Sequence, residues 1–347
     1  MVYKGVDGKM GIQVSKAEFD RALSVWNKDY EFHGPALFKD AGAYSDTDQV
    51  RYDLIRSIDD IIFDKKSHFS FKEVILPITQ RLFYFTEDQV KEAEMNKKKL
   101  IVLLRSCDLH GLRRLDDVYL NGQFEDPYYK AFREKTKFIV MGCEKSFASC
   151  FCVSMGTNRI GDYDGYLHVE DDIVHLDIKD EELLVAFDEV KITKAQVSPK
   201  FVDKNDIEVK VSEKLNLDAI YSEMWEEYSG RCIGCGRCNF SCPTCTCFTM
   251  QDVCYKDNPA CGERRRVWAS CQVDGYSDMA GGHSFRESKG QRMRFKTMHK
   301  IYDFKQQHGY HMCVGCGRCG DVCPEYISFS TAINKLSDVV EEGGNNE

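Results

Sequence analysis

The sequence has no long apolar run, and this absence excludes several classes of protein. The longest notable stretch, LIVLL at 100–104, is far shorter than the roughly 20 residues that a membrane-spanning helix needs. The N-terminal residues, MVYKGVDGKMGIQ, also lack the continuous apolar segment of a signal peptide. We therefore expect a cytoplasmic protein with no membrane partner.

Nucleotide-binding motifs are missing as well. Neither a GxGxxG fingerprint opening a helix nor a GxxxxGK[ST] loop occurs, so the chain gives no sign of binding nicotinamide dinucleotide or ATP. The nine histidines are scattered, and no nucleophile stands in a recognisable pattern with a base. A net charge of −9 disfavours nucleic acid as a partner. These absences predict a chain without a catalytic residue or substrate site of its own.

Cysteine, in contrast, is abundant. The 347 residues include 17 cysteines, an odd number. In a reducing cytoplasm these thiols are not expected to form disulfides, so metal binding becomes the leading explanation. The spacing between the cysteines has to decide which metal they bind.

Two segments share one cysteine spacing. Residues 232–243 read CIGCGRCNFSCP and residues 313–324 read CVGCGRCGDVCP. Both fit C-x2-C-x2-C-x3-C-P, the bacterial ferredoxin pattern for a [4Fe-4S] cluster. Glycines between the ligands can take positive φ and let the backbone approach the cluster: Gly234, Gly236, Gly315 and Gly317.

In two-cluster ferredoxins, the fourth cysteine of each segment binds the other cluster. The same crossing here assigns one cluster to Cys232, Cys235, Cys238 and Cys323, and the other to Cys313, Cys316, Cys319 and Cys242. The alternative is a pair of zinc sites, because C-x2-C pairs also bind zinc. The repeated third cysteine and the x3-C-P ending favour clusters.

Local patterns predict an α/β domain over residues 1–228. Ser15 to Glu18 reads as a capping box, opening a helix with Phe19, Leu23 and Trp26 on one face. Two buried strands are expected at 99–104 and 137–141, with helices around 109–120 and 127–136. Other expected elements are an extended segment at 71–86, a small meander at 160–195 and helical structure at 205–228.

Residues 229–347 form the second expected domain, which carries both cysteine segments. Helix-like stretches flank the cysteines at 248–255, 294–307 and 327–340. They predict a helix-rich ferredoxin-like domain with two [4Fe-4S] clusters. The expected fold class is α+β/α/β: an N-terminal α/β domain followed by this helix-rich ferredoxin-like domain.

A further group of cysteines follows the two expected buried strands. Cys107 comes after the first strand and Cys143 after the second, with Cys150 and Cys152 a short loop later. The carboxyl ends of neighbouring parallel strands meet in one crevice, so these four thiols could bind a third [4Fe-4S] cluster. The alternative is that they are small buried apolar residues.

Several other residues have open roles. Cys245 and Cys247 could pack under the first cluster, whereas Cys254, Cys261 and Cys271 show no recognised ligand spacing. The segments ERRRVWASC (Glu263 to Cys271) and GGHSFRE (Gly281 to Glu287) are interpreted either as a structured loop or as a docking surface for another subunit.

Longer motifs resemble a known family. The segments YSDTDQVRYDLI, KSHFSFKEVILPITQRLFYF, CEKSFASCFCVSMGTN and GERRRVWASCQVDGYSDMAGGHSFRE, together with both cysteine segments, are similar to the iron–sulfur electron-transfer subunit of anaerobic sulfite reductases. The resemblance covers nearly the whole chain. It implies an electron relay in an anaerobic cytoplasmic complex, between a flavin-type subunit that oxidises NADH and a sirohaem subunit that reduces sulfite to sulfide. The N-terminal half also looks like the β-type iron–sulfur subunits of soluble hydrogenases that reduce sulfur, which is the alternative assignment.

Overall fold

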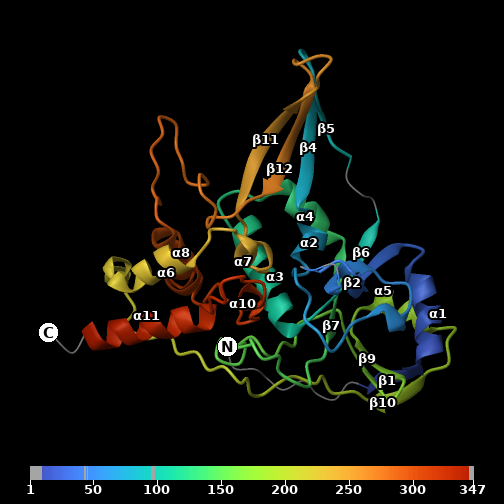
Figure 1. The fold of residues 1–347 in the computed structure, drawn as a ribbon. Helices are drawn as coiled ribbons and strands as arrows, with labels where there is room; N and C mark the ends of the chain where they lie inside the picture. The colour runs from blue at the N-terminus through green and yellow to red at the C-terminus, as the bar shows by residue number, and fades with distance from the viewer. Residues whose placement is uncertain (1–9, 43, 45, 95–97, 344–347) are drawn as a thin grey trace. The chain divides into compact units, whose positions relative to one another are not determined.

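The computed structural model describes residues 10–42, 44, 46–94 and 98–343, which divide into two compact units (Figure 1). The first unit contains the described residues up to Val74, Lys98–Ile207 and the short segment Val314–Cys316. The second contains the rest of the described chain. The first nine residues, over which the sequence analysis expects no signal peptide, lie outside the described part.

An eight-stranded mixed sheet forms the first unit, in the order β10-β1-β9-β8-β7-β6-β2-β3. The pairs β2–β6, β6–β7 and β7–β8 are parallel, and the other pairs of this sheet are antiparallel. The strands are β1 (Met10–Ser15), β2 (Tyr30–Phe38), β3 (Gln49–Leu54), β6 (Lys99–Leu104), β7 (Thr136–Met141), β8 (Gly165–Glu170), β9 (Ile173–Ile178) and β10 (Thr193–Gln196). The two expected buried strands are therefore present as parallel neighbours.

Helix α1 (Lys16–Trp26) shows why the sequence pattern of this unit is informative. The Ser15 side chain accepts a hydrogen bond from the Glu18 amide at 3.3 Å, as the cap predicts. Phe19, Leu23 and Trp26 are buried in the core, and the Trp26 indole donates to the Leu183 carbonyl at 3.0 Å. The other helices in this part are the 3-10 helix η1 (Ile58–Asp60), α2 (Lys72–Ile75), α3 (Ser106–Tyr119), α4 (Pro127–Glu134), α5 (Glu181–Leu184) and the 3-10 helix η2 (Val185–Phe187).

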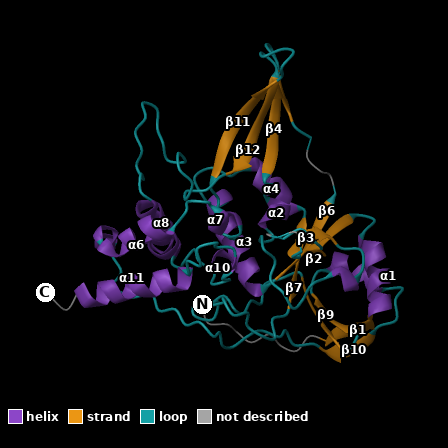
Figure 2. Cartoon of the chain, viewed as in Figure 1, coloured by secondary structure: helices purple, strands orange, loops and turns teal. Residues whose placement is uncertain are grey.

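The second unit contains an antiparallel sheet of four strands in the order β11-β12-β4-β5 (Figure 2). Its strands are β4 (Thr79–Phe85), β5 (Val90–Glu92), β11 (Phe248–Cys254) and β12 (Gly262–Trp268). The helix expected at 248–255 is therefore wrong. Strand β11 pairs with β12 from Phe248↔Trp268 to Cys254↔Gly262, and this ladder satisfies backbone groups that a helix would have satisfied internally.

Most regular secondary structure in the rest of the second unit is helical. The stretches expected at 294–307 and 327–340 are helical, whereas 205–228 forms only short turns of helix before its end. The elements are the 3-10 helices η3 (Leu217–Tyr221) and η4 (Glu223–Trp225), α6 (Glu226–Arg231), α7 (Arg237–Phe240), α8 (Lys289–Met298), the π-helix η5 (His299–Asp303), α9 (Phe304–His308), α10 (Arg318–Asp321) and α11 (Phe329–Gly343). Within the described ranges, no helix is both long and apolar enough to cross a bilayer.

Candidate metal centres

The first cysteine run (Cys232, Cys235, Cys238 and Cys242) begins where helix α6 ends. Gly234 and Gly236 have φ of 71° and 76°, the left-handed conformation that glycine adopts without strain. The turn directs the Gly234 amide at the Cys232 sulfur, 3.3 Å away. Backbone amides aimed at sulfur stabilise a thiolate, as a cluster ligand requires.

The second cysteine run (Cys313, Cys316, Cys319 and Cys323) repeats this local geometry. Gly317 caps helix α10 with φ 73° and ψ −7°, and Gly236 caps α7 with φ 76° and ψ −7°. After the fourth cysteine, the Ile327 amide donates to the Cys323 sulfur at 3.3 Å. The positive φ expected for the glycines of both runs is confirmed.

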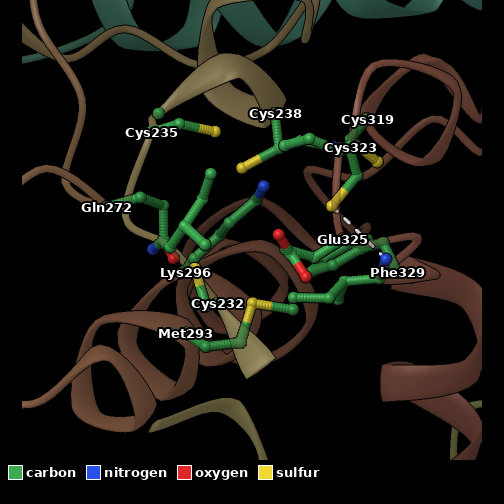
Figure 3. Close-up of a pocket in the computed structure, with 14 residues that line it drawn as sticks. Cys232, Cys235, Cys238, Gln272, Met293, Lys296, Cys319, Cys323, Glu325 and Phe329 are labelled. Atoms are coloured by element: carbon green, nitrogen blue, oxygen red, sulfur yellow. Dashed lines mark hydrogen bonds between the residues drawn. The ribbon is translucent and has the colours of Figure 1, made fainter. Parts of the chain in front are cut away.

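A pocket in the second unit brings cysteines of both runs together (Figure 3). It is lined by Cys232, Cys235 and Cys238 of the first run and by Cys319 and Cys323 of the second. Other lining residues are Ile233, Gly236, Gln272, Met293, Lys296, Pro324, Glu325, Ile327 and Phe329. The four cysteines expected to share the first cluster therefore all face one pocket.

The spacing of the cysteine sulfurs fits a cluster better than a single zinc ion. A zinc ion bound to four thiolates at about 2.3 Å would hold the sulfurs only about 3.8 Å apart. Among the described residues, no three cysteine sulfurs lie within 4.8 Å of one another. Thiolates on separate irons of a cubane stand farther apart, so the donors fit that group.

The electrostatics of the pocket depend on burial and on a lysine. Burial raises the pKa of the Cys232 thiol, while the hydrogen bond from the Gly234 amide opposes this shift. Burial on its own would lower the pKa of Lys296. The neighbouring thiols of Cys238 and Cys319 outweigh that effect and hold the pKa above its usual value. The pocket thus supplies both thiol ligands and positive charge.

The N-terminal cysteine group (Cys107, Cys143, Cys150 and Cys152) comes together in the first unit. Cys107 lies in the first turn of α3 after β6, and Cys143 follows β7, the parallel neighbour of β6. Cys107 and Cys152 belong to one buried cluster, against which Cys143 packs, and the thiol of Cys150 raises the pKa of Cys152. These cysteines therefore lie close together, as the sequence predicts, and ligation by their thiols remains a prediction.

Polar side chains point at the sulfurs of this group. The Arg105 guanidinium donates to the Cys143 sulfur at 3.1 Å, and the Asn205 amide donates to Cys152 at 3.7 Å. Burial, more than any other effect, raises the pKa of Cys152 to about 12. The positively charged iron core of a bound cluster would offset that cost of ionising the thiol.

Cys316 of the second run packs against the N-terminal cysteine group within the first unit. The Phe151 amide donates to the Gly315 carbonyl at 2.8 Å, and Thr157 Oγ1 donates to the Val314 carbonyl at 2.6 Å. A side chain at Gly315 would meet the Phe151 carbonyl oxygen at 2.5 Å, so only glycine fits this close approach.

Four of the five remaining cysteines fall into two places. Cys247 forms a hydrogen-bonded pair with Cys271, which also accepts from the Asn239 amide at 3.1 Å. This pairing with Cys271 lowers the pKa of Cys247 to about 6. Cys254 and Cys261 lie at the far end of the β11–β12 hairpin. No sequence pattern indicated the Cys247–Cys271 pair, because the two residues meet only when β12 has folded against β11.

The arginine-rich segment is a strand rather than a loop. It forms β12, in which Arg264 pairs with Asp252 at 2.6 Å and Arg265 pairs with Glu263. Arg266 donates to the Gln80 side chain of β4 at 2.7 Å. These arginines therefore pair with neighbouring side chains of the sheet, Arg266 buried and Arg264 exposed, and a docking role remains a prediction.

Comparisons with known proteins agree with this description. Residues 231–327 match the family described as a 4Fe-4S dicluster domain, so the chain binds two [4Fe-4S] clusters. The chain is also 30% identical over 313 residues to the Sulfhydrogenase 2 subunit beta of Pyrococcus furiosus, covering 84% of this chain and 89% of that protein. No solved structure matches.

These findings support an iron–sulfur electron-transfer subunit. Of the two families that the sequence motifs suggested, they favour the hydrogenase-type β subunit over the sulfite reductase subunit. The chain belongs to the family of the Sulfhydrogenase 2 subunit beta.

Proposed function

We propose that this chain is the β-type iron–sulfur subunit of a hydrogenase or sulfur reductase complex and relays electrons through its clusters. The observation that carries the proposal is the likeness to the sulfhydrogenase β subunit, which extends over most of both chains. The pocket that faces Cys232, Cys235, Cys238 and Cys323 agrees with it, because this donor set suits a one-electron carrier.

The proposed ligands follow the crossed pattern. Cys232, Cys235 and Cys238 hold the first cluster with Cys323, and Cys242 completes the second with Cys313, Cys316 and Cys319. When bound, each cluster accepts and releases one electron. The chain's own residues hold the cluster, direct amides at its sulfurs and limit its contact with water.

The first cluster is close to solvent in this arrangement. Cys235 is an exposed cysteine, and the neighbouring Ile233 has 57% of its surface exposed. An electron carrier needs such an approach for a partner, since the donor or acceptor must come near the cluster edge. We therefore propose that a partner subunit exchanges electrons at this side of the pocket.

A second candidate is the electron-transfer subunit of an anaerobic sulfite reductase. It is favoured by the segments SCFCVSMG and WASC, which carry Cys150, Cys152 and Cys271 and resemble that family. Its partners would be two further subunits, one of flavin type that oxidises NADH and one that contains sirohaem.

Anaerobic purification of the native complex distinguishes the two candidates. The main proposal expects hydrogen-dependent dye reduction or sulfur reduction by the complex, and iron in this subunit. Sirohaem in a partner subunit, with NADH-dependent reduction of sulfite, would establish the second candidate instead. A colourless chain that holds zinc and no iron would overturn both.

A further inference from the structure

Two buried lysines lie on one helical segment of the second unit. Lys296 in α8 and Lys300 in the π-helix η5 are only 3% and 2% exposed. In the part of the chain that the structure describes, neither amine forms an ion pair with a carboxylate. Lys300 donates to the Thr244 hydroxyl at 2.8 Å. A buried ammonium group without a counter-charge is costly, so another negative group is expected nearby.

Thiols of the two cysteine runs provide the surroundings of both amines. Figure 3 shows the Lys296 amine pointing into the space between the pocket sulfurs, and it interacts with Cys238 and Cys319. The Thr244 hydroxyl that accepts from Lys300 lies 3.4 Å from the Cys242 sulfur, and the thiols of Cys242 and Cys313 are the thiols of the two runs near the Lys300 amine. Cys245 adds its thiol to the surroundings of both. Cys319 is assigned to the second cluster, so Lys296 lies beside one ligand of each cluster, but the pocket that it lines is faced by all four proposed ligands of the first. Among the proposed ligands, Lys300 lies only beside those of the second.

The backbone of the same segment holds one cysteine run in place. The Lys300 carbonyl accepts hydrogen bonds from the amides of Met312 at 2.9 Å and Cys313 at 3.4 Å. The π-helix occurs at this point, and such turns often accompany functional positions. The backbone of this segment therefore holds Cys313, the first cysteine of the second run, close to the side chain of Lys300.

We propose that Lys296 and Lys300 are fixed cations, one for each cluster, which raise the reduction potentials of the two clusters. The proposal rests on the ligand assignment given above. Reduction adds one electron to a cluster and makes no bond, so the cluster becomes more negative by one charge. A cation held beside it stabilises the reduced form more than the oxidised form. Lys296 acts on the cluster bound by Cys238, and Lys300 acts on the cluster bound by Cys242 and Cys313.

The test measures both midpoint potentials of the full-length, cluster-loaded chain by an electron paramagnetic resonance titration. Lys296→Met should make reduction of the first cluster at least tenfold less favourable, which is about 59 mV for one electron. Lys300→Met should shift the second cluster in the same direction. Each variant should move the other cluster less, so the two variants control for each other.

Two further variants separate charge from packing. Lys296→Arg keeps the positive charge and should stay near the wild-type potential, and Lys305→Met, at an exposed position of α9, should change nothing. Potentials that stay unchanged in both methionine variants, or that shift equally in Lys296→Arg, would overturn the proposal. If Lys296→Met loses iron, retention of iron by Lys296→Arg supports the role of charge, whereas equal loss overturns it. Absence of iron from the wild-type chain would count against the proposed function instead.

Discussion

At the scale of single residues, the cluster-binding turns depend on glycines in the left-handed conformation. Gly236 has φ 76°, and a Cβ there would lie 2.9 Å from Ser270 Cβ and from Val273 Cγ2. Gly236→Ala should therefore lower the free energy of unfolding by about 1–3 kcal/mol. It should also reduce the iron bound per chain, because the turn between Cys235 and Cys238 is distorted. Denaturation and metal analysis under anaerobic conditions check both expectations.

Gly230 in helix α6 offers a matched control only six positions away. It has no atom within 4 Å of an added Cβ and is not among the glycines with positive φ. Gly230→Ala should stabilise the chain by about 0.5–1 kcal/mol and leave the iron content unchanged. Equal destabilisation by both substitutions would show that the left-handed turn has no special role.

His168 makes stability depend on pH. Burial lowers the pKa of His168 to about 4, and the rings of His168 and His175 stack at 4.4 Å. Between pH 6.5 and 4 the unfolded chain binds a proton there that the folded chain does not, so stability falls as the pH falls through this window. His168→Gln removes this contribution. The Tm of the wild type should therefore fall relative to that of the variant between about pH 7.5 and about pH 5.5. A constant difference in Tm would contradict the role of His168.

Residue types and spacing predict the cluster ligands, but they do not predict the charges beside them. The x2-x2-x3 spacing is local, so both runs and their glycines could be read directly from the sequence. Lys296 and Lys300 look like ordinary surface residues in the segment RFKTMHK, because lysine is usually exposed. Only the fold shows that they are buried among thiols.

At the scale of elements, the two cysteine runs should depend on each other. Cys323 follows α10 in the second run, yet it lines the pocket with Cys232, Cys235 and Cys238. Cys323→Ser should therefore perturb the spectrum of the first cluster more than that of the second. Electron paramagnetic resonance of the reduced chain can separate the two signals when their potentials differ.

Cys254→Ser is the control for this substitution. Cys254 is exposed at the end of β11 and has no ligand spacing, so its replacement should leave both signals intact. If Cys323→Ser perturbs only the second cluster, the crossed assignment is wrong.

A third cluster in the N-terminal cysteine group should add about four irons to the roughly eight of the two runs. The paired substitution Cys107→Ser and Cys152→Ser should then lower iron from about twelve per chain to about eight. The test needs the full chain, because Val314–Cys316 belongs to the first unit and Ile75–Lys97 to the second. A truncation at residue 228 would break both units.

Cys261→Ser, at the hairpin end of the second unit, should keep the iron content of the wild type. A wild-type chain with about eight irons, unchanged in the paired variant, would show that Cys107 and Cys152 only pack in the core.

Elements with a strong local signal were predictable, and elements made by distant pairing were not. Helix α1 has its cap and its buried face within a dozen residues, and β6 and β7 are mostly apolar and buried. Strand β11 is exposed almost throughout and carries no alternating pattern. Its conformation comes from the ladder with β12, and β12 in turn pairs with β4, far away in the sequence. Local propensity cannot report such contacts.

At the scale of the whole molecule, both units are assembled from separate pieces of chain. The strands β4 and β5 belong to the second unit although the first unit continues after them, and Val314–Cys316 belongs to the first. Such an exchange leaves no composition shift or linker in the sequence. Two compact units could be anticipated from the length, but not which segments each would contain.

The whole chain should carry electrons without turning over a substrate by itself. Nucleotide-binding motifs are missing from the sequence, and the cysteine spacing predicts metal centres rather than a nucleophile beside a base. The purified, cluster-loaded chain should take up about one electron per cluster from a strong chemical reductant, which a spectroscopic titration measures. With NADH and sulfite, or with hydrogen and sulfur, it should form no sulfide until its partner subunits are added. Sulfide production by the single chain would contradict the electron-relay assignment, because it would require a substrate site within these 347 residues. Uptake of electrons without turnover would place the substrate chemistry in the partner subunits.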